Sequence, residues 1–265
     1  MTRITIGQYY PSNSVIHRLD PRIKLLGTLF YITMLFFVTR FVGYGVAAVF
    51  LIFLVWLSKV PPLMLLRGLR AVLFILSFAI LINLFMTPGG DVLFSFGFIR
   101  VTTYGVRMAG QMAARLVLLI TGSSMMTLTT SPIQLTDGIE ALLKPLKVMK
   151  VPAHDIAMMM TITLRQIPTL AEEMDKIMRA QKARGAEIDT GGLIKRAKSL
   201  IPILVPVFVS AFKRADELAT AMEARCYRGD VNRTRMKIMR ISKADCIAVM
   251  IMLLYGALLL LTRIM

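Results

Sequence analysis

The stretch Phe41–Ser58, FVGYGVAAVFLIFLVWLS, contains no charged residue. A continuous apolar run of this length is typical of a helix that crosses the hydrocarbon core of a bilayer, which takes about 20 residues. Four further apolar runs lie along the chain: Leu25–Thr39, Ala71–Met86, Leu116–Thr130 and Cys246–Thr262. The sequence therefore predicts an all-α integral membrane protein with about five transmembrane helices.

Composition supports this prediction and explains the charge. The chain has 265 residues, 56% of them hydrophobic, and a mean hydropathy of +0.68. It carries 32 Lys and Arg against 15 Asp and Glu, a net charge of +17. In a membrane protein such an excess is expected on cytoplasmic segments. Because no basic run is interleaved with aromatic residues in a soluble module, we do not expect nucleic acid as a partner.

The distribution of cations predicts the orientation of the chain in the membrane. Cations flank the first two apolar runs on the same side: Arg18, Arg22 and Lys24 precede the first, and Lys59, Arg67 and Arg70 follow the second. The segment Thr87–Tyr104 has few charges and several glycines, which indicates a hairpin. By the positive-inside rule the N-terminus is cytoplasmic, the hairpin is external and the chain is multi-pass.

A charged region interrupts the apolar pattern. Residues Ser131–Lys243 hold most of the acidic and basic residues in a helical pattern. Three domains are expected: 1–130 with transmembrane helices 1–4, 131–243 as an inserted cytoplasmic helical domain, and 244–265 as the final transmembrane helix. The motif SPIQ at Ser131–Gln134 predicts a helix start with a capping box. Lys144-Pro145 ends or kinks that helix, and Pro152 opens the next.

Two long helices in this region end on nearly the same residues. Ala183-Arg184-Gly185 closes the first, and Ala224-Arg225-Cys226 closes the second, 41 positions later. An arginine near a helix C-terminus can simply complement the helix dipole. Its repetition at matched positions suggests instead two docking points, since a guanidinium presents a planar fork suited to carboxylates on a partner.

Four segments resemble a known family. They are Ser12–Lys24 (SNSVIHRLDPRIK), Gly122–Lys147, Leu164–Ala186 and Leu204–Gly229, and the resemblance is to the T component of energy-coupling factor (ECF) transporters, a type of ABC importer. The resemblance implies a non-catalytic scaffold in a prokaryotic plasma membrane. Its two coupling helices would cross in the cytoplasm, and their tips would dock into two ABC-type ATPase subunits.

The same resemblance implies how the importer divides its tasks. The ATPases would bind the ATP, and a membrane-embedded S component would bind the vitamin or metal ion that is taken up. The ATPase-docking residues would be Ala183, Arg184, Gly185, Ala224, Arg225 and Cys226. Cys226 stands where the family usually has glycine. This departure argues against a tight stop directly after Arg225, and Gly229 could supply the stop one turn later.

Other residue patterns point to no cofactor or metal site in the chain itself. There is no G-x-x-x-x-G-K-[ST] motif for ATP, and neither His17 nor His154 has a second ligand at metal spacing. Arg107, Gln111 and Arg115 step by four along one apolar run, and either a functional role or snorkelling accounts for them. In HRLDPR, His17–Arg22, we expect the start of a surface helix that contacts lipid phosphates. The alternative function is a membrane-embedded enzyme acting on lipid or prenyl phosphates.

Overall fold

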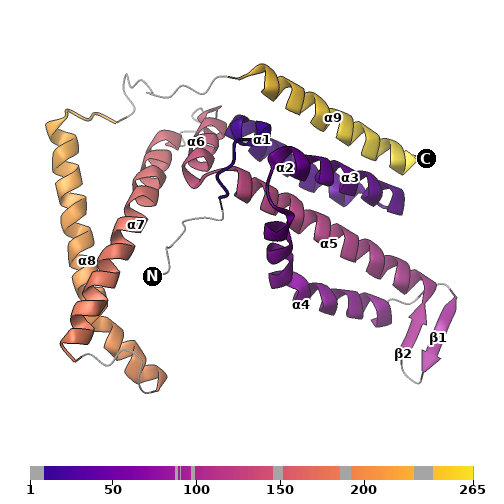
Figure 1. Cartoon of the computed structure of the whole chain (residues 1–265), viewed down its shortest axis with the longest axis horizontal. Coiled ribbons are helices and arrows are strands. Elements are labelled where there is room, and N and C mark those ends of the chain that lie inside the picture. Colours follow the sequence, from indigo (N-terminus) through magenta and orange to yellow (C-terminus); the bar gives the residue numbers. More distant parts are fainter. Residues whose placement is uncertain are drawn as a thin grey trace. The chain divides into compact units, whose positions relative to one another are not determined.

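The computed structural model describes residues 9–86, 89, 91–96, 99–145, 152–185, 192–229 and 241–264. The chain forms two compact units (Figure 1). The first, which we call the bundle, comprises Gly7–Gly138 and Ile238–Met265. The second, which we call the helix-pair unit, is formed mainly by Ile139–Lys237. The limits predicted for the inserted domain, 131 and 243, differ from these by a few residues and stay predictions.

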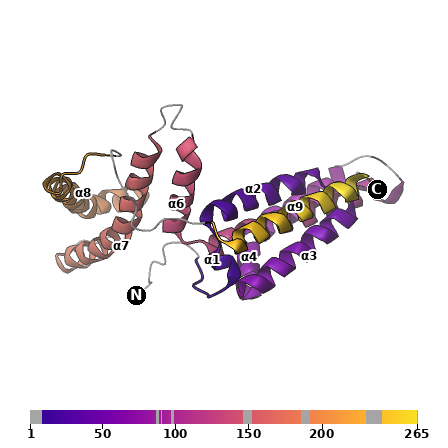
Figure 2. The same ribbon diagram turned by 90° about the horizontal axis from the view of Figure 1, so that it is seen from above.

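The bundle contains most of the apolar helices. They are α1 (Val15–Arg18), α2 (Pro21–Phe37), α3 (Phe41–Ser58), α4 (Pro62–Met86), α5 (Thr103–Thr129) and α9 (Lys243–Ile264). Helix α5 packs against α2, α3 and α4, and α9 packs against α2 and α3. Figure 2 shows α9 lying along α2 and α3, although more than 180 residues of sequence separate it from them (58 to 243).

A β-hairpin joins α4 to α5. Strands β1 (Val92–Phe96) and β2 (Ile99–Thr102) pair antiparallel, so the hairpin predicted within Thr87–Tyr104 is confirmed. The break between the first two long helices lies at residues 38–40, and Gly43 and Gly45 are already inside α3.

The all-α membrane class is confirmed, with this hairpin as an addition. Three helices, α3, α5 and α9, are long and apolar enough to cross a membrane. A fourth span is possible in α4 if its halves, which meet at 61°, cross together. Helix α2 has 17 residues, at the lower limit of the length that a span requires, about 17 to 25 residues. The count of five spans therefore stays a prediction.

The bundle packs its core around aromatic side chains and leaves an apolar exterior. Tyr31 of α2 stacks on Tyr255 of α9 at 5.7 Å, and Tyr255 stacks on Phe50 of α3 at 4.2 Å. Gly256 lets the Phe30 ring approach the α9 backbone, since a Cβ there would lie 2.6 Å from Phe30 Cζ. Trp56 is 75% exposed; a large apolar surface of this kind fits contact with lipid rather than water.

The helix-pair unit is built from α7 (Ala153–Ala183) and α8 (Leu193–Ala224). It follows α6 (Pro132–Leu143), whose predicted start is confirmed: Ser131 N–H donates to Gln134 Oε1 at 3.2 Å, and Gln134 N–H donates to Ser131 Oγ at 3.3 Å. This reciprocal pair is the capping box. Helix α7 runs through Pro168, and α8 runs through Pro202 and Pro206, without ending at them.

Candidate docking site at two arginine-capped helix ends

Arg184 is the residue at which α7 stops. Its φ and ψ are −84° and 7°, and its N–H donates to the carbonyls of Ala180 and Gln181 at 3.2 and 3.1 Å. Gly185 then takes a φ of +86°, in the left-handed region where glycine meets no Cβ penalty. The Gly185 N–H donates to Lys182 O at 3.0 Å. This reversal ends the helix and leaves Ala183, Arg184 and Gly185 exposed.

Arg225 ends α8 with nearly the same geometry. Its φ and ψ are −92° and 12°. Cys226 follows with a φ of +54°, and its N–H donates to Glu223 O at 2.8 Å. The Tyr227 N–H donates to Met222 O at 3.0 Å. These two bonds make up the Schellman motif, which closes many helices and usually has glycine at the reversal.

The expectation that the helix would not stop tightly after Arg225 is therefore wrong. Cys226 adopts the left-handed conformation despite its Cβ, and the stop lies at Cys226 rather than at Gly229. The bond from the Tyr227 hydroxyl to Met158 Sδ, 3.0 Å long, ties the segment after the stop to α7. Ala224, Arg225 and Cys226 are exposed, as are their counterparts on α7.

The two ends lie far apart because α7 and α8 cross in opposite directions. Tyr227, just beyond α8, contacts Met158 near the start of α7. In the middle of the pair, Glu173 of α7 contacts Ser210 and Arg214 of α8. Since α7 continues 26 positions beyond Met158 to Arg184, at 1.5 Å per residue the arginine ends are separated by about 40 Å. The crossing that the resemblance implied is present within this unit.

A polar contact fixes the crossing point. Glu173 accepts a hydrogen bond from the Ser210 hydroxyl, and its Oε2 lies 2.8 Å from Arg214 Nη2. The bond from Ser210, together with the Arg214 cation, holds the pKa of Glu173 below its ordinary value. Leu170, Ala211 and Leu218 line a cavity of about 130 Å³ beside this contact. The apolar contact between α7 and α8 is thus only partly filled at this point.

Within the HRLDPR segment Arg18 is exposed, but the segment as a whole does not form the lipid-facing surface helix start that we expected. His17, Asp20 and Lys24 are buried in the bundle. Lys24 Nζ donates to His17 O and Thr129 O, at 3.1 and 3.0 Å. His17 Nε2 donates to Tyr10 O at 2.9 Å, so its Nδ1 accepts from the Ser14 hydroxyl at 2.7 Å. Burial lowers the pKa of this imidazole, and nearby Lys24 lowers it further.

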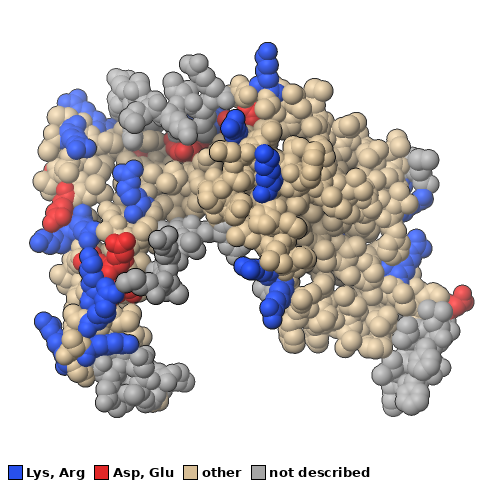
Figure 3. Space-filling view, in the orientation of Figure 1, with Lys and Arg blue, Asp and Glu red and all other residues tan. Residues whose placement is uncertain are grey.

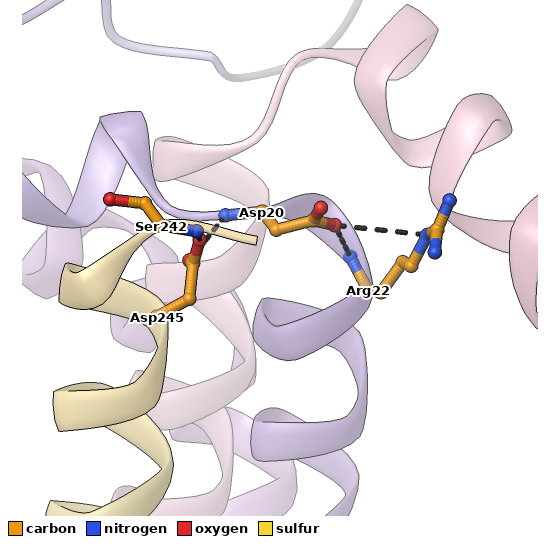
Figure 4. Close-up of polar contacts among 4 residues, drawn as sticks. All are labelled: Asp20, Arg22, Ser242 and Asp245. Carbon is orange, nitrogen blue, oxygen red and sulfur yellow. Dashed lines mark hydrogen bonds and ion pairs between the residues drawn. The ribbon is translucent and has the colours of Figure 1, made fainter. Parts of the chain in front are cut away.

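Asp245, at the start of α9, is a residue that the sequence did not single out. Its carboxylate accepts from Asp20 N–H at 2.9 Å and from Ser242 N–H at 2.7 Å (Figure 4). Asp20 in turn caps α2 by accepting from Arg22 N–H at 2.9 Å. The contact spans 225 residues of sequence. A lone acid beside an apolar run was the only sequence signal that could have found it.

The polar residues that step by four along α5 have a structural role in part. Gln111 Nε2 donates to Thr39 O at 2.7 Å, and Arg115 Nη2 donates to Val38 O at 2.9 Å. Both acceptors lie at the break after α2, where a helix leaves carbonyls without intrahelical partners. Arg107 is exposed. Within the described part of the chain, no group of three or more His, Cys, Asp or Glu is placed to hold a metal ion.

The chain is similar to known transport proteins over nearly its whole length. A family model described as cobalt transport protein (CbiQ) matches residues 12–238. A protein of Thermosediminibacter oceani is 54% identical over 248 residues, 94% of this chain and 93% of the relative. One of Clostridium kluyveri is 53% identical over 262 residues, 98% of this chain and 97% of the relative.

The similarity extends to more distant organisms. A protein of Listeria innocua is 42% identical over 259 residues, 97% of this chain and 98% of the relative. All three relatives carry the name energy-coupling factor transporter transmembrane protein EcfT. A match of this extent, with the apolar helices of the bundle, makes the chain a membrane-embedded transporter subunit. It belongs to the family of transmembrane components of energy-coupling factor transporters.

Proposed function

We propose that this chain is the energy-coupling scaffold of an ECF-type ABC importer. It transmits ATP-driven conformational change from two ATPase subunits to a substrate-binding S component for uptake of a vitamin or a metal ion. The ATPases bind and hydrolyse the ATP. The chain crosses a prokaryotic plasma membrane several times, with its N-terminus in the cytoplasm, in agreement with the cations that flank its first two long helices.

The observation that carries this proposal is the equivalence of the two arginine ends. Arg184 and Arg225 hold matching backbone angles, each is followed by a left-handed residue, and each is exposed. If each arginine only capped its own helix, the two ends would have no need to match each other. Two exposed guanidinium groups at opposite ends of the α7–α8 pair suit two similar partners, each offering a carboxylate. We assign one ATPase subunit to each end.

The small residues before each arginine fit the same assignment. Ala183 and Ala224 are the last helical residues and are exposed. A methyl group there lets a partner backbone approach the helix end closely. Gly185 and Cys226 hold left-handed backbone, so each helix ends directly after its arginine. Each arginine is therefore presented at a protruding tip, which suits insertion into a groove.

An apolar stripe on α8 supports a membrane-embedded partner. Ile201, Val205, Phe208 and Phe212, spaced by four, three and four, are all more than half exposed. Such spacing places them on one face of the helix. A stripe of this kind would be costly in water, and it fits the apolar surface of another membrane protein. We assign the S component to it.

The alternative of a membrane enzyme acting on lipid or prenyl phosphates is not retained. The relatives are named as transporter components, and the acids at the α7–α8 crossing serve a contact between helices: Glu173 bonds Ser210 and Arg214. A Mg²⁺-dependent phosphate site would need acids grouped toward a shared ion.

Co-purification tests the proposal. The tagged chain, extracted from its own cells in mild detergent, should bring two ATPase copies and one small hydrophobic protein, identified by mass spectrometry. The complex should hydrolyse ATP, and the chain alone should not. Recovery of the chain with soluble metabolic enzymes only, or ATP hydrolysis by the chain free of ATPases, would overturn the assignment.

A further inference from the structure

A cavity of about 230 Å³ lies inside the bundle, at the end where α1 sits. Its walls come from α1, α2, α3, α5 and α9 and are almost entirely apolar. Tyr31 and Phe50 form one end, where they stack with Tyr255. Ile16 and Lys24 border the other end. The cavity exceeds the ~150 Å³ of an apolar cavity that takes up benzene.

The cavity is half-open, and exposed residues of α1, α3 and α9 are among those that line it. Three of its lining residues, Val15, Phe53 and Ile247, are 54%, 41% and 56% exposed. Two of these belong to helices long and apolar enough to cross a membrane. The surroundings of the opening are therefore the hydrocarbon chains of the bilayer. An apolar, half-open cavity beside lipid chains is a site for one of them.

Exposed cations border the same end of the bundle. Arg18 precedes the lining residue Leu19, Lys59 caps α3 two positions after Leu57, and Lys243 precedes Ala244. Among the residues described, no acid lies within ion-pair distance of Arg18, Lys59 or Lys243. Figure 3 shows Lys and Arg as isolated blue groups on the largely tan surface of the bundle. Basic groups beside a site between transmembrane helices suit an anionic headgroup.

The amine of Lys24 is not available for a headgroup. Its Nζ already donates to His17 O and Thr129 O inside the bundle, and the side chain is buried. The cavity itself thus offers apolar contact, and charge recognition falls to the three exposed cations outside it. This division matches an amphiphile with a hydrocarbon tail and a negatively charged head.

We propose that this cavity binds one acyl chain of an anionic phospholipid, whose phosphate contacts Arg18, Lys59 and Lys243. The bound lipid fills the space that the helices leave between α3 and α9. The site is independent of the arginine ends of α7 and α8. The test of this lipid site is therefore independent of the test of ATPase docking.

Lipid retention by the full chain tests the proposal. The detergent-purified protein is mixed with dioleoyl phosphatidylglycerol or with dioleoyl phosphatidylcholine, and native mass spectrometry counts the lipids that stay bound. We expect one phosphatidylglycerol to saturate at lower concentration than phosphatidylcholine. The Lys59→Ala, Lys243→Ala double variant should lose about 25-fold in affinity for phosphatidylglycerol only, at about fivefold per cation.

A second variant tests the cavity itself. Ala248→Phe places a ring among the lining residues. It should lower the affinity for both lipids at least tenfold, because each methylene of the acyl chain that is buried raises the affinity about fourfold. Leu254→Phe, on an exposed face of α9, and Arg107→Ala, an exposed cation at the other end of α5, are the matched controls and should bind as wild type. Thermal unfolding confirms that each variant folds.

Several outcomes would overturn the proposal. Equal retention of the two lipids by the wild-type protein would show that the exposed cations do not recognise an anionic headgroup. Unchanged lipid binding by a folded Ala248→Phe protein would show that the acyl chain does not occupy the cavity. If Ala248→Phe fails to fold, Thr28→Leu, which fills the cavity from α2, replaces it under the same criterion. If the cavity instead receives a side chain of a partner protein, the chain alone retains neither lipid, and the proposal is wrong.

Discussion

Gly185 and Cys226 occupy the same position at the ends of α7 and α8, each with a positive φ, +86° and +54°, directly after an arginine. The left-handed conformation costs an L-residue about 1–2 kcal/mol and costs glycine almost nothing. Cys226 therefore holds a strained backbone at the place where α7 has an unstrained one. The reversal itself is the common feature of the two ends.

The strain predicts opposite effects of substitution at the two positions. Gly185→Ala should destabilise the end of α7 by about 1 kcal/mol, whereas Cys226→Gly should leave the end of α8 unchanged or up to about 1 kcal/mol more stable. Hydrogen–deuterium exchange of the last-turn amides measures both, since 1 kcal/mol changes exchange about fivefold. Faster exchange in the Cys226→Gly variant, or unchanged exchange in the Gly185→Ala variant, would contradict the strain inferred for Cys226.

Asp245 should contribute more to the stability of the bundle than any exposed acid. Asp245→Ala removes the acceptor of two N–H groups, those of Asp20 and Ser242. Leaving such groups unsatisfied costs about 1–3 kcal/mol each, so we expect a loss of about 2–6 kcal/mol in thermal unfolding of the purified chain. Asp216→Ala, on the exposed surface of α8, is the control and should have no measurable effect.

The His17 network makes the bundle sensitive to acid. Burial holds the pKa of His17 below its unfolded value, so the unfolded chain takes up a proton first as the pH falls. The contribution of neutral His17 is complete above about pH 6.5 and is lost as the pH drops through the folded pKa. His17→Gln should show a smaller decrease in melting temperature between pH 7 and pH 5. Parallel curves for the two proteins would contradict this.

The orientation of the chain gives a further prediction. Cysteines placed at Asp91, beside the hairpin, and at Lys198, on α8, in a chain without Cys226 and Cys246, should react with an impermeant thiol reagent from opposite sides of the membrane. Both positions are exposed. Reaction of the two from the same side in intact cells would contradict a cytoplasmic N-terminus and an external hairpin.

Local sequence signals predicted the parts of the fold that local physics determines. The capping box at Ser131–Gln134, the break at Lys144-Pro145 and the apolar runs all correspond to helices or helix ends. The positions of Arg184 and Arg225 at the ends of their helices also followed from the sequence. The bend of 61° in α4, between Arg70 and Val72, did not, because Gly68 two positions earlier is a weak signal by itself.

Contacts between distant segments were not readable from one sequence. The partner of Asp20 is Asp245, 225 positions away, and Lys24 bonds to Thr129. Asp20 and Lys24 looked like surface charges because they stand beside other charges in the sequence. The reversal at Cys226 was missed for another reason: cysteine has no preference for a positive φ, and hydrogen bonds from Cys226 and Tyr227 impose it.

Quantitative pull-down of the ATPases tests the central claim most directly. A cation that only complements a helix dipole is worth about 0.3–1 kcal/mol, so losing it should leave the assembly intact. Losing one partner of a charge-assisted contact at an interface costs about 2–5 kcal/mol, roughly 30- to several-thousand-fold in affinity. Arg184→Glu and Arg225→Glu should each weaken ATPase binding by that amount, and the double variant should be worse.

Arg165→Glu, at an exposed position in the middle of α7, serves as the control and should bind the ATPases as wild type, with thermal unfolding measured for every protein. The account predicts loss of binding in folded proteins altered at Arg184 or Arg225 and retention in the control. If both folded Arg→Glu proteins bind the ATPases as tightly as wild type, the arginines only cap their helices and the docking claim is wrong.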